Sequence, residues 1–204
     1  MSYFDHLLKD KKLAKYIYWQ EPVKLKAHKN ICLRLCASIM SQQLSTKVAS
    51  VIFHRFLDLY GGKEPTPEQI IATPFDTLRA IGLSNAKTQY VLNVARFAID
   101  NELTDKKLKK MSDDGVIALL TEIKGVGRWT VEMLLMFTLG REDLFAVDDY
   151  GLQVAMKHIY KLDDSNKKEF REKMLRISAK WSPYRTYACR HLWHWKDNAP
   201  APDK

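Results

Sequence analysis

Apolar residues recur every three or four positions along most of the chain, which is the period of an amphipathic helix. Two stretches show the spacing most clearly, namely Leu33, Cys36, Ala37, Met40 and Leu44, and then Leu152, Ala155, Met156 and Ile159. The run from Leu134 to Phe137 is apolar on every side, which predicts a buried helix that begins near Trp129 and ends at Gly140. Strand signals are short and isolated. The pattern therefore predicts an all-α fold.

Hydroxyl residues followed by proline mark several predicted helix starts. Thr66-Pro67-Glu68-Gln69 has the form of a capping box, and we expect Thr73-Pro74 and Ser182-Pro183 to begin helices in the same way. Eight glycines and seven prolines in 204 residues leave few turns, which disfavours an all-β protein with many short connections.

Composition narrows the class of partner. Lys and Arg number 33 against 24 Asp and Glu, a net charge of +9, which favours a polyanionic partner such as nucleic acid. A hydrophobic fraction of 46% with 28% charged residues is typical of a globular protein. The chain shows no signal-peptide pattern and no apolar run near 18 residues, and three cysteines suit neither a disulfide framework nor an iron–sulfur cluster. We therefore expect a cytoplasmic protein, nucleoid-associated if bacterial, with no membrane partner and no cofactor.

One motif suggests contact with phosphate. The segment 120–130, LTEIKGVGRWT, reads as a helix, a tight turn with Gly125 and Gly127, and a second helix. Glycines permit close approach of a ligand to the backbone, and amides at the start of the second helix would form an anion site. Carbonyls inside the turn (Thr121, Ile123 and Val126) are candidate ligands of a monovalent cation, although no catalytic metal is expected. By itself such a turn fits an ordinary helix–helix corner equally well.

The continuation of the motif carries a resemblance. Residues 145–152, FAVDDYGL, place two carboxylates before another predicted helix, and Ile39–Ser45 and Trp181–Trp193 supply two flanking blocks. With these four blocks the chain resembles the helix-hairpin-helix DNA glycosylases, in particular the 3-methyladenine DNA glycosylase II branch, over about residues 30 to 195. The chain lacks room for the amino-terminal β-rich domain of larger bacterial relatives. It also has Met133 where some relatives have a tyrosine that lines the base pocket.

The resemblance implies a two-lobed helical fold that holds DNA across the cleft between its lobes. It assigns about residues 40–140, with the hairpin, to a middle lobe, and residues 1–39 plus 141–204 to a second lobe. The implied activity is monofunctional hydrolysis of the N-glycosidic bond of alkylated purines, such as 3-methyladenine and 7-methylguanine, in duplex DNA. The protein is expected to act as a monomer.

The same resemblance suggests roles for individual residues. Asp149 is the expected catalytic carboxylate, because a fixed negative charge stabilises the cationic sugar that forms as the base departs. Asp148 lies about 100° away on a helix and would act as N-cap or scaffold. The expected base pocket consists of Trp129, Trp193, Tyr187 and Met133. The expected DNA contacts are Lys124, Gly125, Val126, Gly127, Arg128, Thr130, Gln42 and Gln43.

Other interpretations of the sequence remain open. The chain could remove another damaged purine, or bind DNA through the hairpin without catalysis. A bifunctional glycosylase–lyase needs a lysine amine, and those relatives carry it at the position where this chain has Trp129. Tyr187 could equally be a core residue, whereas the family motif favours a pocket role for Trp129 and Trp193. His191 and His194 near Cys189 are more consistent with packing than with a metal site.

Overall fold

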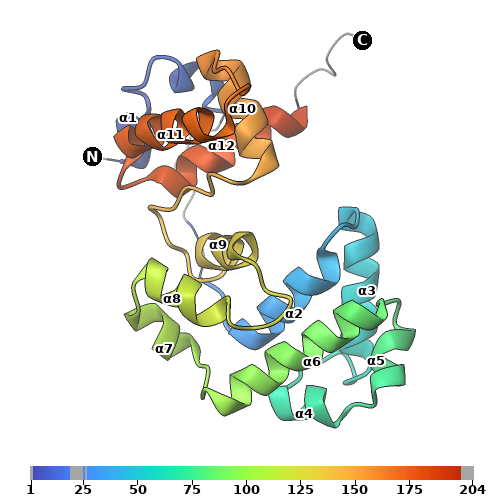
Figure 1. Cartoon of the computed structure of the whole chain (residues 1–204). Coiled ribbons are helices and arrows are strands. Elements are labelled where there is room, and N and C mark those ends of the chain that lie inside the picture. Colours follow the sequence, from blue (N-terminus) through green and yellow to red (C-terminus); the bar gives the residue numbers. More distant parts are fainter. Residues whose placement is uncertain (1, 19–24, 26, 199–204) are drawn as a thin grey trace. The chain divides into compact units, whose positions relative to one another are not determined.

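The computed structural model describes residues 2–18, 25 and 27–198, and these residues form helices and connecting turns without a strand (Figure 1). The predicted all-α fold class is confirmed. The chain divides into two compact units: unit 1 comprises Met1–Lys26 and Gly140–Lys204, and unit 2 comprises Ala27–Leu139. No helix among the described residues is long and apolar enough to cross a membrane.

Unit 2 is built around α6, the long helix Asn85–Asp100, against which α2 (Ile31–Ser41) and α4 pack. Its other helices are α3 (Thr46–Asp58), α4 (Pro67–Ala72), α5 (Phe75–Ala80), α7 (Asp105–Lys110), α8 (Asp113–Leu120) and α9 (Arg128–Phe137). Helix α9 contacts both α8 and α2. The turn that joins α8 to α9 is the predicted hairpin, and it is therefore held between packed helices.

Unit 1 combines the amino-terminal segment with the carboxyl-terminal helices (Figure 1). Its α-helices are α1 (Tyr3–Leu7), α10 (Tyr150–Tyr160), α11 (Lys167–Ser178) and α12 (Arg185–Asn198), with 3₁₀ turns at η1 (Leu13–Tyr16) and η2 (Ala179–Trp181). Helix α10 packs along α12, and α12 also contacts η1 and η2. The predicted core positions Leu152, Ala155, Met156 and Ile159 are all buried on α10.

Several sequence predictions differ from the structure at helix ends. Helix α2 stops at Ser41, so Leu44 lies in the following loop and is 38% exposed rather than part of the core. Residues 27–39 also belong to unit 2, whereas the resemblance assigned them to the second lobe. Phe137, at the end of the apolar run, is the last residue of α9 and is 43% exposed rather than buried.

The predicted capping box at Thr66 is confirmed, because the Thr66 hydroxyl accepts the Gln69 backbone N–H and the Gln69 side-chain oxygen accepts the Thr66 backbone N–H. The other two predicted starts are wrong in detail. Thr73 ends α4, and Pro74 takes the N-cap position of α5. Ser182 follows η2, precedes a cis peptide bond to Pro183 and donates a hydrogen bond to Asp143, so α12 starts only at Arg185.

Candidate active site

The hairpin between α8 and α9 depends on Gly125. This residue has φ +106°, a conformation that side chains disfavour, and a Cβ there would overlap the ring of Tyr90 on α6. Asn93, one turn further along α6, donates its side-chain amide to the Lys124 carbonyl at 3.1 Å. Helix α6 therefore fixes the backbone of the hairpin from one side.

Gly127 differs from Gly125 because the fold does not require a glycine there. Its φ of −91° is open to any residue, and a Cβ would meet no atom within 4 Å. It is the N-cap of α9, and no side chain caps that helix. Neither packing nor backbone conformation requires a glycine at position 127. Because glycine has no side chain, the start of α9 stays accessible to a ligand, which is the arrangement expected of a phosphate site.

The side chains around the hairpin divide into two groups. Lys124 and Arg128 are exposed, and Arg128 Nε donates to the buried carboxylate of Glu132 at 2.9 Å. Val126 and Thr130 are 5% and 3% exposed, because they point into unit 2. The side chains of these two residues are therefore not available for DNA contact, and the predicted contacts at Val126 and Thr130 could be made only by their backbone groups.

Carbonyls at the hairpin were candidate cation ligands. The Ile123 carbonyl accepts the Val126 amide at 2.9 Å and so closes the turn, while Thr121 ends α8 with its hydroxyl bonded to the Ile117 carbonyl. These hydrogen bonds do not test whether a cation binds to the carbonyls, so the cation site stays a prediction.

The loop after α2 carries the two predicted glutamines. Gln43 is exposed and has φ +59°, the left-handed conformation. Lys87 of α6 fixes the start of the loop, because its ammonium donates to the carbonyls of Met40 at 3.0 Å and Gln42 at 2.5 Å. Partial burial lowers the pKa of Lys87. Lys87 was not predicted from the sequence, since nothing in its local pattern distinguishes it from a surface lysine.

The aromatic and sulfur candidates on α9 lie near its start. Trp129 is 44% exposed, and Met133, one turn further along the helix, is half-buried. Both belong to unit 2, whereas Asp149, Trp193 and Tyr187 belong to unit 1.

Asp149 is the N-cap of α10. Its Oδ1 accepts the Leu152 amide at 2.8 Å and the indole N–H of Trp193 at 2.7 Å. Two donors on one oxygen fix the orientation of the carboxylate, and the helix start favours a negative charge at this place. Asp148 points elsewhere: it pairs with Arg171 of α11 at 3.1 Å in an exposed ion pair. Of the two roles predicted for Asp148, N-cap or scaffold, the N-cap role is therefore wrong, because Asp149 takes it.

Gly151 permits the contact between Asp149 and Trp193. A Cβ at this position would lie 3.1 Å from the indole Cδ1 and 3.2 Å from Asp149 Oδ1, closer than ordinary van der Waals contact. Gly151 was not predicted as a site residue either, although a glycine in the first turn of a predicted helix disfavours that helix and so signals a packing constraint.

Tyr187 does not share this arrangement. It is 5% exposed, its ring stacks on Tyr3 with centroids 4.0 Å apart, and its hydroxyl donates to Glu142 at 2.6 Å. Burial, together with the Glu142 carboxylate, raises the pKa of Tyr187. Its assignment to a base pocket therefore needs correction, because both its face and its hydroxyl are used within unit 1.

Arg185 is a structural residue of unit 1. Its guanidinium binds the Asp143 carboxylate at 2.7 and 3.1 Å and the Asp143 carbonyl at 2.9 Å. Burial opposes ionisation of Asp143, but hydrogen bonds from Arg185 and Ser182 outweigh it and lower the pKa of this carboxyl. The pair anchors the start of α12, the helix that carries Trp193.

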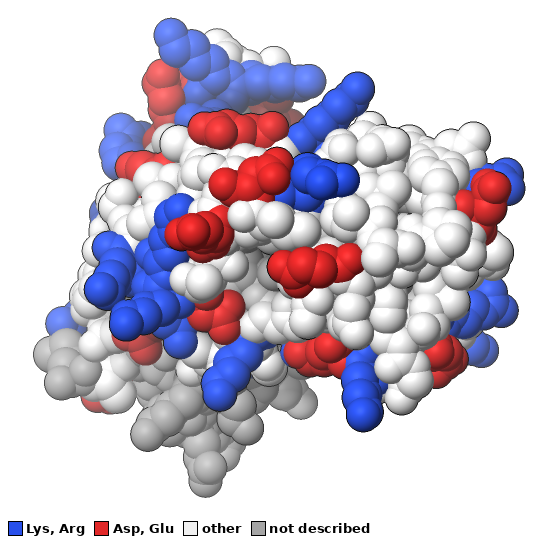
Figure 2. Space-filling view, turned by 90° about the horizontal axis from the view of Figure 1, so that it is seen from below, with Lys and Arg blue, Asp and Glu red and all other residues white. Residues whose placement is uncertain are grey.

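Charges are mixed on the face shown in Figure 2. Lys and Arg side chains alternate there with Asp and Glu, and a broad area carries neither. On this face the positive excess is not gathered into one basic surface. Specific groups, such as the amides at the start of α9, therefore indicate an anion site more clearly than the net charge does.

Comparison with known proteins decides the family. A family model described as HhH-GPD superfamily base excision DNA repair protein matches residues 36–180, more than half of the chain. The chain belongs to the HhH-GPD superfamily. The span that matches this superfamily includes the hairpin and Asp149, whereas Trp193 lies beyond it.

Relatives within the superfamily share a named activity. The chain is 34% identical to DNA-3-methyladenine glycosylase 1 of Schizosaccharomyces pombe over 90% of this chain and 80% of that protein. It is 31% identical to a DNA-3-methyladenine glycosylase of Bacillus subtilis over 78% of this chain, but spans only 55% of that longer relative. The solved structure of the S. pombe 3-methyladenine DNA glycosylase in complex with abasic DNA matches with a TM-score of 0.84 and 31% identity, covering 98% of this chain and 99% of that one.

Proposed function

We propose that this HhH-GPD protein is a monofunctional DNA glycosylase that hydrolyses the N-glycosidic bond of alkylated purines, of the 3-methyladenine and 7-methylguanine type, in duplex DNA. The observation that carries the proposal is the carboxylate of Asp149, held at the N-terminus of α10 by the Leu152 amide and the Trp193 indole. Relatives named as DNA-3-methyladenine glycosylases support the substrate class.

Alkylation leaves the purine positively charged, so the base departs as a neutral leaving group without needing a strong general acid. The electrons of the C1′–N bond go to the base, and positive charge develops on the deoxyribose. A carboxylate in a fixed position stabilises that charge electrostatically. Water then attacks C1′ and loses a proton, which Asp149 accepts or passes to solvent, and an abasic site remains.

Unit 2 would bind the DNA backbone. The uncapped start of α9, the accessible position of Gly127 and the exposed side chains of Lys124 and Arg128 suit a phosphate. Gln42 and Gln43 sit in a loop that Lys87 fixes, and we assign them to the gap left by the extruded nucleotide. The exposed face of Trp129 would stack on the cationic base, a contact that contributes about 0.5–2 kcal/mol.

The decisive experiment compares Asp149→Asn with Asp148→Asn. Asp149→Asn keeps the shape of the side chain but removes its charge, so we expect loss of most base release from a 7-methylguanine duplex in single-turnover assays, with binding retained. Asp148→Asn is the matched control, because it disturbs only an exposed pair with Arg171 and should keep nearly full activity. Equal rates for both variants would contradict the assignment of Asp149, and absence of base release by the wild type would favour a non-catalytic DNA-binding module.

A second measurement separates hydrolysis from lyase chemistry. The indole at position 129 cannot form a Schiff base, because its nitrogen lone pair belongs to the ring. We therefore expect intact phosphodiester backbones after base release and strand breaks only after alkali. Efficient covalent trapping of the protein on DNA by borohydride would instead require an amine nucleophile.

A further inference from the structure

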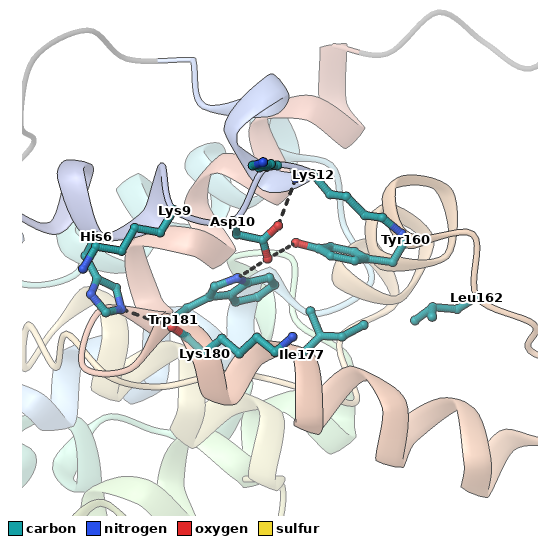
Figure 3. A pocket seen from close by; sticks show the side chains of 10 residues that line it. His6, Lys9, Asp10, Lys12, Tyr160, Leu162, Ile177, Lys180 and Trp181 are labelled. Atoms are coloured by element: carbon teal, nitrogen blue, oxygen red, sulfur yellow. Dashed lines mark hydrogen bonds between the residues drawn. The ribbon is translucent and has the colours of Figure 1, made fainter.

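A pocket of about 600 Å³ lies beside Tyr160, the last residue of α10 (Figure 3). Its lining comes from the end of α1 and the segment after it, the end of α10 with Leu162, and the end of α11 with η2, all within unit 1. Asp149 precedes the first residue of α10 and Tyr160 is the last, so a rise of about 1.5 Å per residue separates the two places by roughly 16 Å. The pocket shares no residue with the Asp149 arrangement.

The floor of the pocket is a carboxylate that neutral donors satisfy. Asp10 Oδ2 accepts the Tyr160 hydroxyl at 2.7 Å and the Trp181 indole N–H at 3.0 Å, while Oδ1 accepts the amides of Lys12 at 3.0 Å and Leu13 at 3.2 Å. Burial would raise the pKa of Asp10, but these bonds outweigh it and lower that pKa. The Asp10 carboxylate is therefore ionised, and its hydrogen bonds come from neutral donors rather than from a lysine ammonium.

The rim of the pocket carries an excess of positive charge. Lys9, Lys11, Lys12 and Lys180 line it, and none of the four forms an ion pair within the part of the chain that the structure describes. The Lys12 side chain runs along the Tyr160 ring, with its nitrogen 5.6 Å from the ring centroid (Figure 3). Four ammonium groups against one carboxylate leave an excess of three positive charges. An excess of positive charge around one cavity favours a multiply charged anion.

We propose that this pocket binds the phosphate of a nucleotide. Its lining combines the four ammonium groups with apolar walls from Leu162 and Ile177 and the edges of two aromatic side chains, which suits a ligand that is charged at one end and flat or apolar at the other. The volume falls within the range of about 300–1,000 Å³ typical of small-molecule sites. A simple carboxylate ligand would compensate one of the three excess positive charges and leave two, whereas phosphate groups bring more negative charge into the same space.

A free nucleotide and a DNA strand would present the same phosphate chemistry to this pocket. The bound nucleotide is either free in solution or part of a DNA strand that also reaches Asp149, since roughly 16 Å corresponds to about five base pairs at 3.4 Å each. The DNA case rests on the proposed function, whereas binding of a free nucleotide does not, because the pocket residues take no part in the chemistry assigned to Asp149.

The test uses the full chain with Lys9, Lys12 and Lys180 changed together to Gln, and a control with Lys63, Lys106 and Lys110, exposed lysines of unit 2, changed to Gln. Calorimetry measures binding of ATP, and anisotropy measures binding of an undamaged 24-base-pair duplex over a series of salt concentrations. Both variants lower the net charge equally, so a difference between them reports the pocket and not the total charge.

A free nucleotide is the source if the wild type binds ATP and the pocket variant weakens that binding at least tenfold while the control does not. A DNA nucleotide is the source if ATP does not bind but the pocket variant alone lowers the salt slope, by about 0.9 for each phosphate that the protein no longer neutralises. The proposal is overturned if pocket variant and control behave alike in both assays. If the triple variant does not melt cooperatively, Lys180→Glu serves instead.

Discussion

Changing Trp193 to Phe tests whether the indole positions the proposed catalytic carboxylate or serves only as an aromatic surface. Phe keeps an aromatic face on α12 but has no N–H, so the 2.7 Å bond to Asp149 Oδ1 is removed. The 2.8 Å bond from the Leu152 amide remains, because it comes from the backbone. The variant therefore removes the indole's constraint on the carboxylate and leaves the charge of Asp149 in place.

The expected magnitude follows from the type of bond. A hydrogen bond to a charged group contributes about 1.5–3 kcal/mol. If the whole of this contribution acted on the transition state, base release would slow by about 10- to 150-fold, since about 1.4 kcal/mol corresponds to a factor of ten. Because the Leu152 amide still orients the carboxylate, we expect the lower end of that range. Asp149→Asn, which removes the charge itself, should cost considerably more.

Single-turnover release of 7-methylguanine from a duplex measures the effect, and anisotropy on the same duplex measures affinity. Trp195→Phe is the matched control: Trp195 lies two residues further along α12, where it stacks on His158 with centroids 4.6 Å apart. We expect Trp193→Phe to lower the rate with affinity nearly unchanged, and Trp195→Phe to leave both unchanged. A wild-type rate for Trp193→Phe, or a loss of affinity without loss of rate, would refute the positioning role.

Further predictions concern the hairpin, the loop after α2 and a buried histidine. Gly125→Ala should lower the melting temperature, because its positive φ and the neighbouring ring exclude a side chain, whereas Gly127→Val should leave the melting temperature unchanged and weaken duplex binding; equal stability losses would contradict this division. Lys87→Met removes both bonds to the carbonyls after α2, so we expect base release to slow by about 5- to 30-fold at nearly unchanged affinity for undamaged duplex, on the basis of about 1–2 kcal/mol, and an unchanged rate would show that the loop needs no such support. Burial, with a smaller effect from nearby positive charges, lowers the pKa of His191 from 6.5 to about 4, so the unfolded chain binds this proton first as the pH falls. The free energy of unfolding should therefore be unaffected above pH 7 and fall by up to about 3 kcal/mol between pH 6.5 and 4, which urea titrations can measure; His191→Phe should reduce that slope, and an identical slope would contradict the assignment.

Helical periodicity predicted the fold class because most helices of the chain have one buried face. Leu152, Ala155, Met156 and Ile159 are all buried on α10, as their spacing predicted. Helix ends were less predictable. Thr73 has the composition of an N-cap, but its hydroxyl bonds back to the Gln69 carbonyl and so ends the preceding helix. A local pattern cannot distinguish these two uses of the same hydroxyl.

Among site residues, too, local backbone requirements were predictable from the sequence and contacts with distant residues were not. The motif located the hairpin because glycine there reflects a local backbone requirement, which the positive φ of Gly125 expresses. It did not locate Lys87 or Arg171, whose partners lie 45 and 23 residues away along the chain. Tyr187 illustrates the reverse case. Its position in a motif suggested a ligand-facing ring, but the stacking of Tyr3 on that ring could not be read from sequence.

The choice between the two adjacent aspartates rests on one structural difference. Asp148 and Asp149 are both carboxylates and both precede α10, so charge and spacing alone do not separate them. Asp148 shares its charge with Arg171 on an exposed surface, where an ion pair contributes little and its geometry varies. Asp149 instead accepts an amide N–H and an indole N–H on one oxygen, and these two bonds fix the orientation of its carboxylate at the start of α10. A group that stabilises a transient cation must be held in a fixed position, and of this pair Asp149 is held by donors from the backbone and from a partly buried side chain.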